Sequence, residues 1–455
     1  MSLPRYPEYK DSGIESLGHV PACWEIRRLK HVSNIFLSNV DKKTYEGEVP
    51  VKLCNYTDVY YNDVITRDLD YMPATASTAQ IAKFELRRGD TIITKDSETA
   101  DDIAISAYVP DDLPGVVCGY HLALVRSLPG VSGRYLKWLF DSNYVKSKFA
   151  VLANGLTRVG LSHYALVNVE LPIATSAEQE LIAGFLDRET AKIDTLMKVQ
   201  RRLIDRLTEK RHAVISHAVT KGLDPHVRMK TSGIEWLGDV PAHWTLPTLR
   251  RVIQRIEQGW SPDCDNRQAD PDEWGVVKAG CVNRGVFIDS ENKALPENLS
   301  PIVDYEIRPG DVLMSRASGS PALVGSTAFV AVVRPRLMLS DKIFRIHVEK
   351  SVDPRYFVAA FNGHAMRTQV ERAISGADGL ANNLPKASLM DFRFPVPPLK
   401  EQESIIEHLI HRTGQMDSLI KEAERAIALL QERRTALISA AVTGKIDVRG
   451  LAEAA

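Results

Sequence analysis

Cysteine is scarce in this sequence, and long apolar runs and an excess of one charge are missing. The five cysteines are scattered over 455 residues without a C-x-x-C pair, so neither a disulfide framework nor a zinc ribbon is predicted. No apolar run reaches the roughly 18 residues that a membrane helix needs. The first ten residues also lack the basic-then-apolar layout of a signal peptide. We therefore expect a cytoplasmic protein that does not enter a membrane.

The motifs of common catalytic sites are missing as well. There is no G-x-x-x-x-G-K-[ST] loop that could cradle the phosphates of ATP. The one Pro-Pro pair, Pro397–Pro398, has aliphatic neighbours and not the Asp/Asn-Pro-Pro-aromatic pattern of amino-methyltransferases. His408 and His411 stand three apart on a predicted helix, but no third ligand accompanies them, so no metal site is predicted. The sequence therefore predicts a binding subunit with no catalytic residues and no cofactor of its own.

The net charge of −1, from 57 basic and 58 acidic side chains, lacks the basic excess that often indicates a nucleic-acid partner. If the chain binds DNA, its positive charge must be gathered on one face of the folded molecule. The content of 44% hydrophobic and 25% charged residues is that of an ordinary globular protein.

The chain contains one unit written twice. Gly13–Trp24 returns as Gly233–Trp244 with nine of twelve positions identical. Leu171–Asp224 aligns without a gap on Phe394–Asp447, 223 residues further on. A period this long is not that of a solenoid repeat. It indicates two duplicated domains related by a pseudo-two-fold axis.

The second repeated segment predicts a long helix in each half. Apolar residues recur there at alternating steps of three and four, or multiples of them, which is the seam of a coiled coil. The seam residues are Ile182, Leu186, Ile193, Leu196, Leu203, Leu207 and Val214 in the first half, and Ile405, Leu409, Met416, Leu419, Ala423, Ala426, Leu430 and Leu437 in the second. Thr175–Glu178 resembles a capping box, and Gly222 and Gly444 stand where helices commonly stop. We expect helices of about 40 residues, or about 60 Å.

A stripe this narrow favours another helix as its partner. We therefore expect the two helices to pack on each other as an antiparallel coiled coil; the alternative is that each packs only on its own domain. The segments between them, Ser33–Glu170 and Ile253–Arg393, mix short β-like runs such as Thr91–Thr94 and Ala328–Val333 with helical stretches. Further β-like runs are Leu122–Val125 and Val312–Met314, and the helical stretches are Tyr135–Phe149 and Tyr356–Ile374.

The predicted fold class is α+β, with two pseudo-two-fold related α+β domains joined by two long helices. The expected boundaries are residues 1–170 for the first domain, 171–224 for the central helical spacer, 225–393 for the second domain and 394–455 for the C-terminal helical spacer.

Equivalent polar positions in the two globules are candidates for DNA contact. Lys95 and Arg316 each follow a Gly-Asp turn and a short strand, and Arg is a common bidentate reader of guanine while Lys often meets phosphate. The polar, glycine-containing segments Gly155–Arg158 and Gly379–Asn383 form a second pair. The candidate DNA-binding residues are Lys95, Thr157, Arg158, Ser162, His163, Arg316, Asn382, Asn383 and Lys386. Each of them taken singly is equally compatible with a solvated loop residue.

The repeated G-I-E-x-L-G-x-V-P-x-x-W segments, the Glu178–Gln179 and Glu401–Gln402 pairs and the two A-V-T endings resemble the DNA specificity (S) subunit of type I restriction-modification systems. The resemblance covers almost the whole chain. It implies two target recognition domains, each reading one half of a split asymmetric site in double-stranded DNA. It also implies two methyltransferase (M) subunits and two restriction/translocase (R) subunits as partners, which would use S-adenosylmethionine, ATP and Mg.

Two alternatives remain open at this point. The chain could be an adaptor whose coiled coil holds two protein-binding domains. It could also be a fragment of a fused restriction enzyme with activity of its own, which the missing motifs disfavour.

Overall fold

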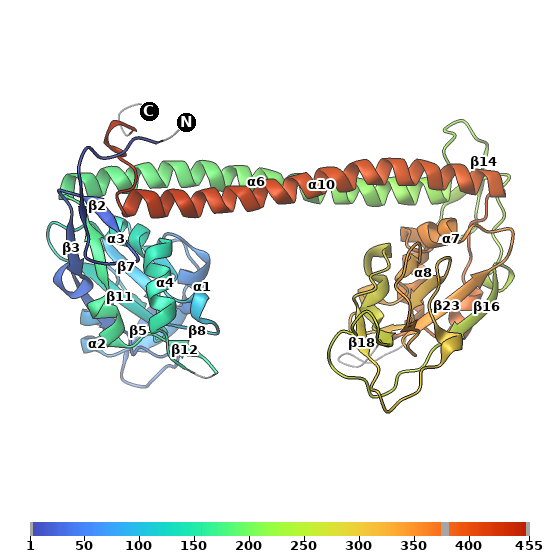
Figure 1. The fold of residues 1–455 in the computed structure, drawn as a ribbon, viewed down its shortest axis with the longest axis horizontal. Coiled ribbons are helices and arrows are strands. Elements are labelled where there is room, and N and C mark those ends of the chain that lie inside the picture. The colour runs from blue at the N-terminus through green and yellow to red at the C-terminus, as the bar shows by residue number, and fades with distance from the viewer. Residues whose placement is uncertain (1–2, 156, 375–381, 452–455) are drawn as a thin grey trace. The chain divides into compact units, whose positions relative to one another are not determined.

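The computed structural model describes residues 3–155, 157–374 and 382–451 (Figure 1). The chain forms two compact units, one of Met1–Arg201 with Glu424–Ala455 and the other of Arg202–Ala423. The division between the units therefore falls within the two long helices, so each unit contains one globule and part of both helices. In the described part of the chain, no helix is long and apolar enough to span a membrane.

The globule of the first unit is built on a four-stranded antiparallel sheet in the order β4-β11-β7-β9, beside a three-stranded sheet in the order β10-β5-β6. Its strands are β1 (Tyr9–Asp11), β2 (His19–Pro21), β3 (Glu25–Arg28), β4 (Ser33–Leu37), β5 (Val49–Cys54), β6 (Met72–Ala76), β7 (Asp90–Thr94), β8 (Asp96–Ser97), β9 (Ser106–Tyr108), β10 (Val116–Cys118), β11 (Leu122–Ser127), β12 (Val159–Gly160) and β13 (Glu170–Ile173). Its helices are α1 (Tyr56–Tyr61), α2 (Thr78–Phe84), α3 (Gly133–Phe140), α4 (Asn143–Leu152) and α5 (His163–Asn168).

The central sheet of this globule is covered on both faces. Neighbouring residues of a strand point to opposite faces, and on β7 Ile92 belongs to the core shared with β5 and β10, while Ile93 belongs to the core shared with α3 and α4. Leu124 and Val125 divide in the same way on β11. Because both faces are buried, these strands read in the sequence as continuous apolar runs and not as an alternation.

The second unit repeats this sheet, with the strand order β16-β23-β19-β21. Its strands are β14 (Met229–Thr231), β15 (Asp239–Pro241), β16 (Ile253–Gln258), β17 (Gly275–Val277), β18 (Asn292–Ala294), β19 (Val312–Ser315), β20 (Ala317–Ser318), β21 (Thr327–Phe329), β22 (Leu337–Met338), β23 (Ile343–Val348) and β24 (Asn382–Asn383). Its helices are α7 (Pro354–Phe361), α8 (His364–Ala373) and α9 (Lys386–Asp391). The duplication inferred from the repeats is therefore a duplication of topology.

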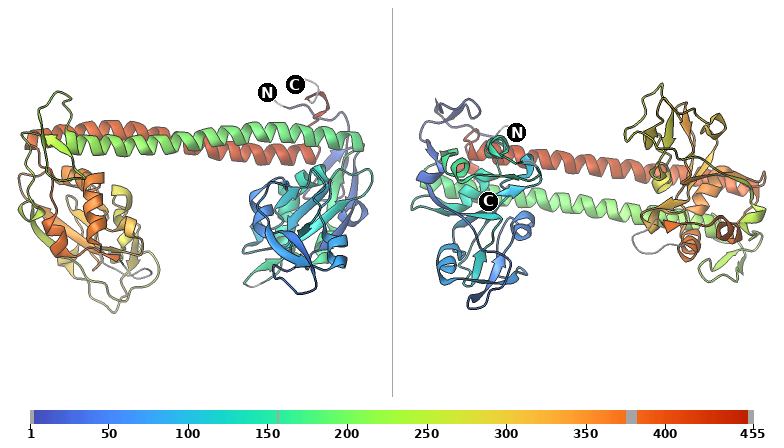
Figure 2. Two further views of the ribbon diagram at one scale, coloured as in Figure 1. Left: turned by 180° about the vertical axis from the view of Figure 1, so that it is seen from behind. Right: turned by 90° about the horizontal axis from the view of Figure 1, so that it is seen from below.

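The long helices α6 (Ser176–Lys221) and α10 (Leu399–Val442) have 46 and 44 residues. In the first unit the start of α6 shares a hydrophobic core with the end of α10, through Ile182 and Ile438 among others. In the second unit the end of α6 shares a core with the start of α10, through Val219 and Ile405. Within each unit the two helices lie side by side and run in opposite directions (Figure 2). The predicted antiparallel coiled coil is confirmed.

Equivalent ion pairs support the helix pair in each unit. Arg434 Nε lies 3.2 Å from Asp194 Oδ1 in the first unit, and Arg211 Nε lies 3.1 Å from Asp417 Oδ1 in the second. The predicted helix ends are also confirmed. Thr175 and Glu178 form the expected cap at the start of α6, where the Thr175 hydroxyl donates to Glu178 Oε2 over 2.7 Å.

Part of the predicted seam is wrong. Leu196, Leu203 and Leu419 are 51%, 41% and 48% exposed, whereas Met197 is buried and Ile204 is half-buried. A heptad seam alternates steps of three and four residues. After Ile193 the step is four, so the next buried residue is Met197 and not Leu196. Counting apolar residues could not distinguish a leucine on the seam from one beside it.

The predicted helices 135–149 and 356–374 are each two helices. In the first, Ser142 ends the run and caps α4, accepting a hydrogen bond from the Val145 amide; in the second, Gly363 precedes α8. The predicted strand Ala328–Val333 is wrong beyond Phe329, since β21 covers only Thr327–Phe329. Val330 is still buried and bonded to Asp311, but the residues after it leave the sheet and include the exposed Val332.

Candidate nucleic-acid interface

In the first unit a two-residue β-ribbon brings the two sets of predicted residues together. Strand β8 pairs antiparallel with β12, and the Leu161 amide donates to the Lys95 carbonyl oxygen over 2.8 Å. Lys95, which follows β7, therefore lies beside the segment that carries Thr157, Arg158 and Ser162. The paired residues Asp96 and Gly160 are 64 positions apart in the sequence.

The Lys95 side chain is already partnered within the protein. Its Nζ lies 3.4 Å from Asp96 Oδ1 and 4.5 Å from the centroid of the Tyr120 ring, and only 16% of the side chain is exposed. A cation over an aromatic face is held by the ring quadrupole. Lys95 is thus oriented by its neighbours and does not extend freely into solvent.

The other predicted residues of this unit differ in what they can offer a ligand. Thr157 and Arg158 are exposed, and His163 is exposed as the first residue of α5. The Ser162 hydroxyl caps α5 and accepts a hydrogen bond from the Ala165 amide over 3.1 Å. Ser162 therefore positions the segment, whereas Arg158 and His163 have side chains available for contact.

The sequence analysis missed the aromatic part of this site. Tyr120 is 52% exposed beside Lys95, and His121 Nδ1 lies 2.5 Å from Asp96 Oδ2. Tyr56 also belongs here, since its side chain hydrogen-bonds with Ser97 of β8, and burial raises the pKa of Tyr56. The available signal was the Tyr-His pair directly before the buried strand β11, because exposed aromatic residues beside basic ones are typical of nucleic-acid sites.

The second unit builds the same ribbon with other side chains. Strand β20 pairs with β24, and the Leu384 amide donates to the Arg316 carbonyl oxygen over 2.9 Å. The Arg316 amide donates to the Lys342 carbonyl oxygen over 2.8 Å, as the Lys95 amide does to His121 over 3.1 Å. Lys95 and Arg316 are therefore structurally equivalent.

Arg316 is also partnered by its own unit. Its guanidinium donates to the Asp341 carbonyl oxygen over 3.4 Å and lies 5.9 Å from the centroid of the Phe344 ring. Burial alone would raise the pKa of Asp341, but hydrogen bonds from Ser261 and Lys342 and the charge of Arg316 outweigh it and lower that pKa. The carboxylate therefore stays ionised beside these cations.

The remaining predicted residues of this unit lie on the ribbon or directly after it. Asn382 and Asn383 form β24, and the Asn382 side chain donates to the Gly319 carbonyl oxygen over 3.5 Å. Lys386 begins α9, as His163 begins α5, and its exposed Nζ lies 3.4 Å from the Ile256 carbonyl oxygen. The predicted positions Leu156 and 379–381 lie outside the described residues.

His408 and His411 are exposed on α10. Across the described ranges, no group of three or more His, Cys, Asp or Glu side chains is placed to hold a metal ion. The residues described above offer hydrogen-bond donors, cations and an aromatic face, which are groups that can contact a nucleic acid.

Three curated proteins that are similar to this chain are type I restriction enzyme specificity subunits. No protein-family model matches the chain. The EcoKI specificity subunit of Escherichia coli strain K12 is 21% identical over 96% of this chain and 92% of its own length. The putative MjaX specificity subunit of Methanocaldococcus jannaschii is 23% identical over 97% and 98%. The EcoEI specificity subunit of Escherichia coli is 29% identical, but the alignment spans only 41% of this chain and 32% of that protein.

Solved structures agree in fold. A chain from a type I R-M system studied for its complex assembly and conformational transition superposes with a TM-score of 0.68 at 17% identity, over 93% of this chain and 98% of that one. The HsdS subunit from Thermoanaerobacter tengcongensis gives a TM-score of 0.50 at 17% identity, over 94% and 98%. The resemblance stated from the repeated motifs is confirmed, as is the prediction of a specificity component in place of an enzyme: over almost its whole length the chain is similar to type I restriction enzyme specificity subunits.

Proposed function

We propose that each globule reads one half of a bipartite, asymmetric sequence in double-stranded DNA. The observation that carries this proposal is the combination of one topology with unlike side chains. Both units have the same sheet order and the same ribbon, but Lys95 stands where the other unit has Arg316, and His163 where it has Lys386. An asymmetric site requires two globules that share a fold but present different side chains to the bases.

The partners of the family supply the chemistry in this proposal. The chain directs two methyltransferase subunits, which use S-adenosylmethionine, and two restriction/translocase subunits, which use ATP and Mg. The chain itself binds none of these cofactors. We propose the cytoplasm as the place of assembly, where the complex meets the DNA.

The test is an exchange of one globule. Residues 33–170 are replaced by the equivalent segment of a relative with another target, and modified adenines are mapped across the host genome before and after. We expect one half of the methylated motif to change and the other half to stay, because each globule has its own core. The reverse exchange of residues 253–393 is the matched control. A change of both halves in either exchange would refute independent reading.

A protein-binding adaptor is distinguished by the salt dependence of duplex binding. Phosphate contacts release counterions, so the affinity of a DNA reader falls steeply as salt concentration rises. Binding to DNA that is weak and insensitive to salt, in the assembled complex, would favour the adaptor.

A further inference from the structure

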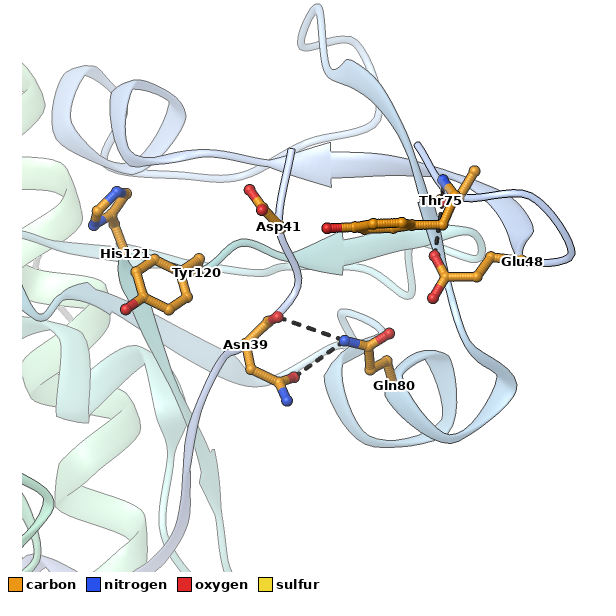
Figure 3. A pocket seen from close by; sticks show the side chains of 8 residues that line it. Asn39, Asp41, Glu48, Thr75, Gln80, Tyr120 and His121 are labelled. Atoms are coloured by element: carbon orange, nitrogen blue, oxygen red, sulfur yellow. Dashed lines mark hydrogen bonds between the residues drawn. The ribbon is translucent and has the colours of Figure 1, made fainter. Parts of the chain in front are cut away.

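A polar cavity of about 530 Å³ lies beside Tyr120 in the first unit (Figure 3). Three segments form its wall: the loop that runs from Asn39 to Glu48, the end of β6 with the start of α2, and the Tyr-His pair before β11. All of them belong to the globule whose ribbon carries Lys95. The cavity is therefore next to the predicted DNA contacts and not part of them.

The walls of this cavity are held in place by internal hydrogen bonds. Gln80 Oε1 accepts from the Ser77 amide over 3.0 Å, and Gln80 Nε2 donates to Asn39 Oδ1 over 3.3 Å. The Thr75 hydroxyl donates to Glu48 Oε2 over 2.7 Å. Figure 3 draws the Gln80–Asn39 and Thr75–Glu48 contacts among the side chains that line the cavity. A site whose rotamers are already fixed loses little side-chain entropy when a ligand enters.

The groups left for a ligand have the chemistry of a nucleobase site. Tyr120 offers a half-exposed aromatic face that Lys95 already approaches, and bases stack on such faces. The Asn39 side chain is held by Gln80 through its Oδ1, and Asp41 and Glu48 provide carboxylate acceptors in the lining of the cavity. Those carboxylates repel a phosphate but accept hydrogen bonds from an exocyclic amino group.

We propose that this cavity receives one amino-bearing nucleobase, taken out of the DNA stack, as a specificity-determining contact of the first globule. The inference rests on the proposed function, because it requires DNA on this face. Lys42 and Lys43 are exposed in the loop that forms one wall, where they can meet the flanking phosphates. Tyr120 is then a stacking surface, and the carboxylates of Asp41 and Glu48 read the amino edge of the base.

The second unit does not repeat this arrangement, so the contact is asymmetric. The Lys95–His121 and Arg316–Lys342 backbone bonds are equivalent, so Asp341 occupies the place of Tyr120. In the same register Leu37 pairs with Ala123 and Gln258 pairs with Phe344, which places Trp260 where the first unit has Asn39. Neither the Asn39 amide nor the Tyr120 ring is repeated at its equivalent position.

The experiment uses the complex of the full chain with its methyltransferase partners and its mapped recognition sequence. Duplexes carry a single abasic nucleotide opposite each position of the first half-site in turn. Removing the pairing partner lowers the cost of extruding a base, so we expect binding on the order of tenfold tighter at the extruded position. Methyltransferases extrude the adenine that they modify, and that position is the internal positive control. The proposal requires one further position with the same enhancement.

Asn39→Gly, which removes a side chain from the cavity wall, and Tyr120→Ala should each abolish the enhancement at the further position and keep it at the modified adenine. Tyr61→Ala is the matched control, since Tyr61 is an exposed tyrosine that does not line the cavity. No further position in the wild type, or one that persists in both variants, would overturn the proposal. Failure of the wild-type complex to bind the intact sequence would instead refute the proposed function. Variants that bind DNA normally but no longer assemble with the methyltransferase would show that the cavity receives a side chain of that partner. This outcome would overturn the proposal that a nucleobase occupies it.

Discussion

The hydroxyl of Tyr9 donates a hydrogen bond to the carbonyl oxygen of Gly444, 3.0 Å away, and joins the first strand of the chain to the end of α10. The Asp447 amide adds a bond to the Pro4 carbonyl oxygen over 2.8 Å. In the second unit, Gly222 ends α6 in the same way but continues covalently into β14. The two ends of the chain therefore meet by packing at the place where the other copy is one continuous segment.

This relationship predicts that the chain tolerates circular permutation. A flexible linker of about five residues from Leu451 to Leu3, with new ends between Asp224 and Pro225, should give a folded protein, because the new break falls in an exposed connection. Circular dichroism and thermal unfolding of the assembled complex measure the result. New ends between Ile92 and Ile93 provide the control and should prevent folding, since both residues are fully buried. A permutant at Asp224 that is as unstable as this control would contradict the prediction.

The second prediction concerns Lys137, a lysine only 3% exposed whose Nζ lies 2.7 Å from Asp63 Oδ1 and 2.8 Å from Asp141 Oδ2. We expect Lys137→Met to lower the free energy of unfolding of the first unit by about 3–5 kcal/mol, because it leaves the largely buried Asp141 carboxylate without its cation, whereas Asp63 keeps Arg434. Urea unfolding measures this. Lys192→Met removes an exposed lysine paired with Glu189 over 2.7 Å and should cost about 0.5 kcal/mol or less. Equal losses in the two variants would contradict the assignment.

The Asp63 carboxylate predicts a pH dependence of the free energy of unfolding. Burial alone would raise the pKa of Asp63, but Lys137 and Arg434 outweigh it, so the pKa is lower in the folded protein than in the unfolded chain. Its stabilising contribution is therefore complete above the unfolded pKa of about 3.9 and is lost as the pH falls through the folded pKa. Asp63→Asn should accordingly remove stability at neutral pH and lose less of it on acidification than the wild type. Parallel curves of unfolding free energy against pH would contradict this sign.

Lys95→Ala and Arg316→Ala are expected to weaken DNA binding by about 1–3 kcal/mol if these residues read a base, and more uniformly across sequences if they hold phosphate. Titration of duplexes by the assembled complex at fixed salt distinguishes the two. Lys192→Ala, on the exposed face of α6, is the control. Unchanged affinity in both folded variants would mean that Lys95 and Arg316 only shape the ribbon.

The two long helices are predicted to set the gap between the half-sites. One heptad added to each, near Gln200 and Ala423, keeps the apolar seam in phase and lengthens each helix by about 10 Å. We expect the methylated motif to keep both halves and gain up to about three base pairs between them. Methylome sequencing of a host that carries the variant reads this directly. A variant that still assembles and modifies only the original spacing would refute the role of the helices as a spacer.

The sequence alone determined the duplication and the long helices, because both depend on patterns local to the chain. Identical residues at Gly13–Trp24 and Gly233–Trp244 report a repeat without any knowledge of packing. Heptad spacing and the cap at Thr175 act within one helix, so they could be read directly. The sequence could not show that Met197 is buried and Leu196 is exposed, because the facing helix decides which of the two is covered.

Only the tertiary structure decided what surrounds the candidate site. Lys95 and Arg316 were found by their equivalent places in the repeat, but the aromatic face of Tyr120 comes from another segment and meets Lys95 through sheet pairing. The cavity depends on the same long-range assembly, since Asn39, Gln80 and Tyr120 are contributed by three separate segments. Side chains that converge from distant segments leave no periodic trace in a sequence, because their spacing is set by the fold and not by a helix or strand repeat.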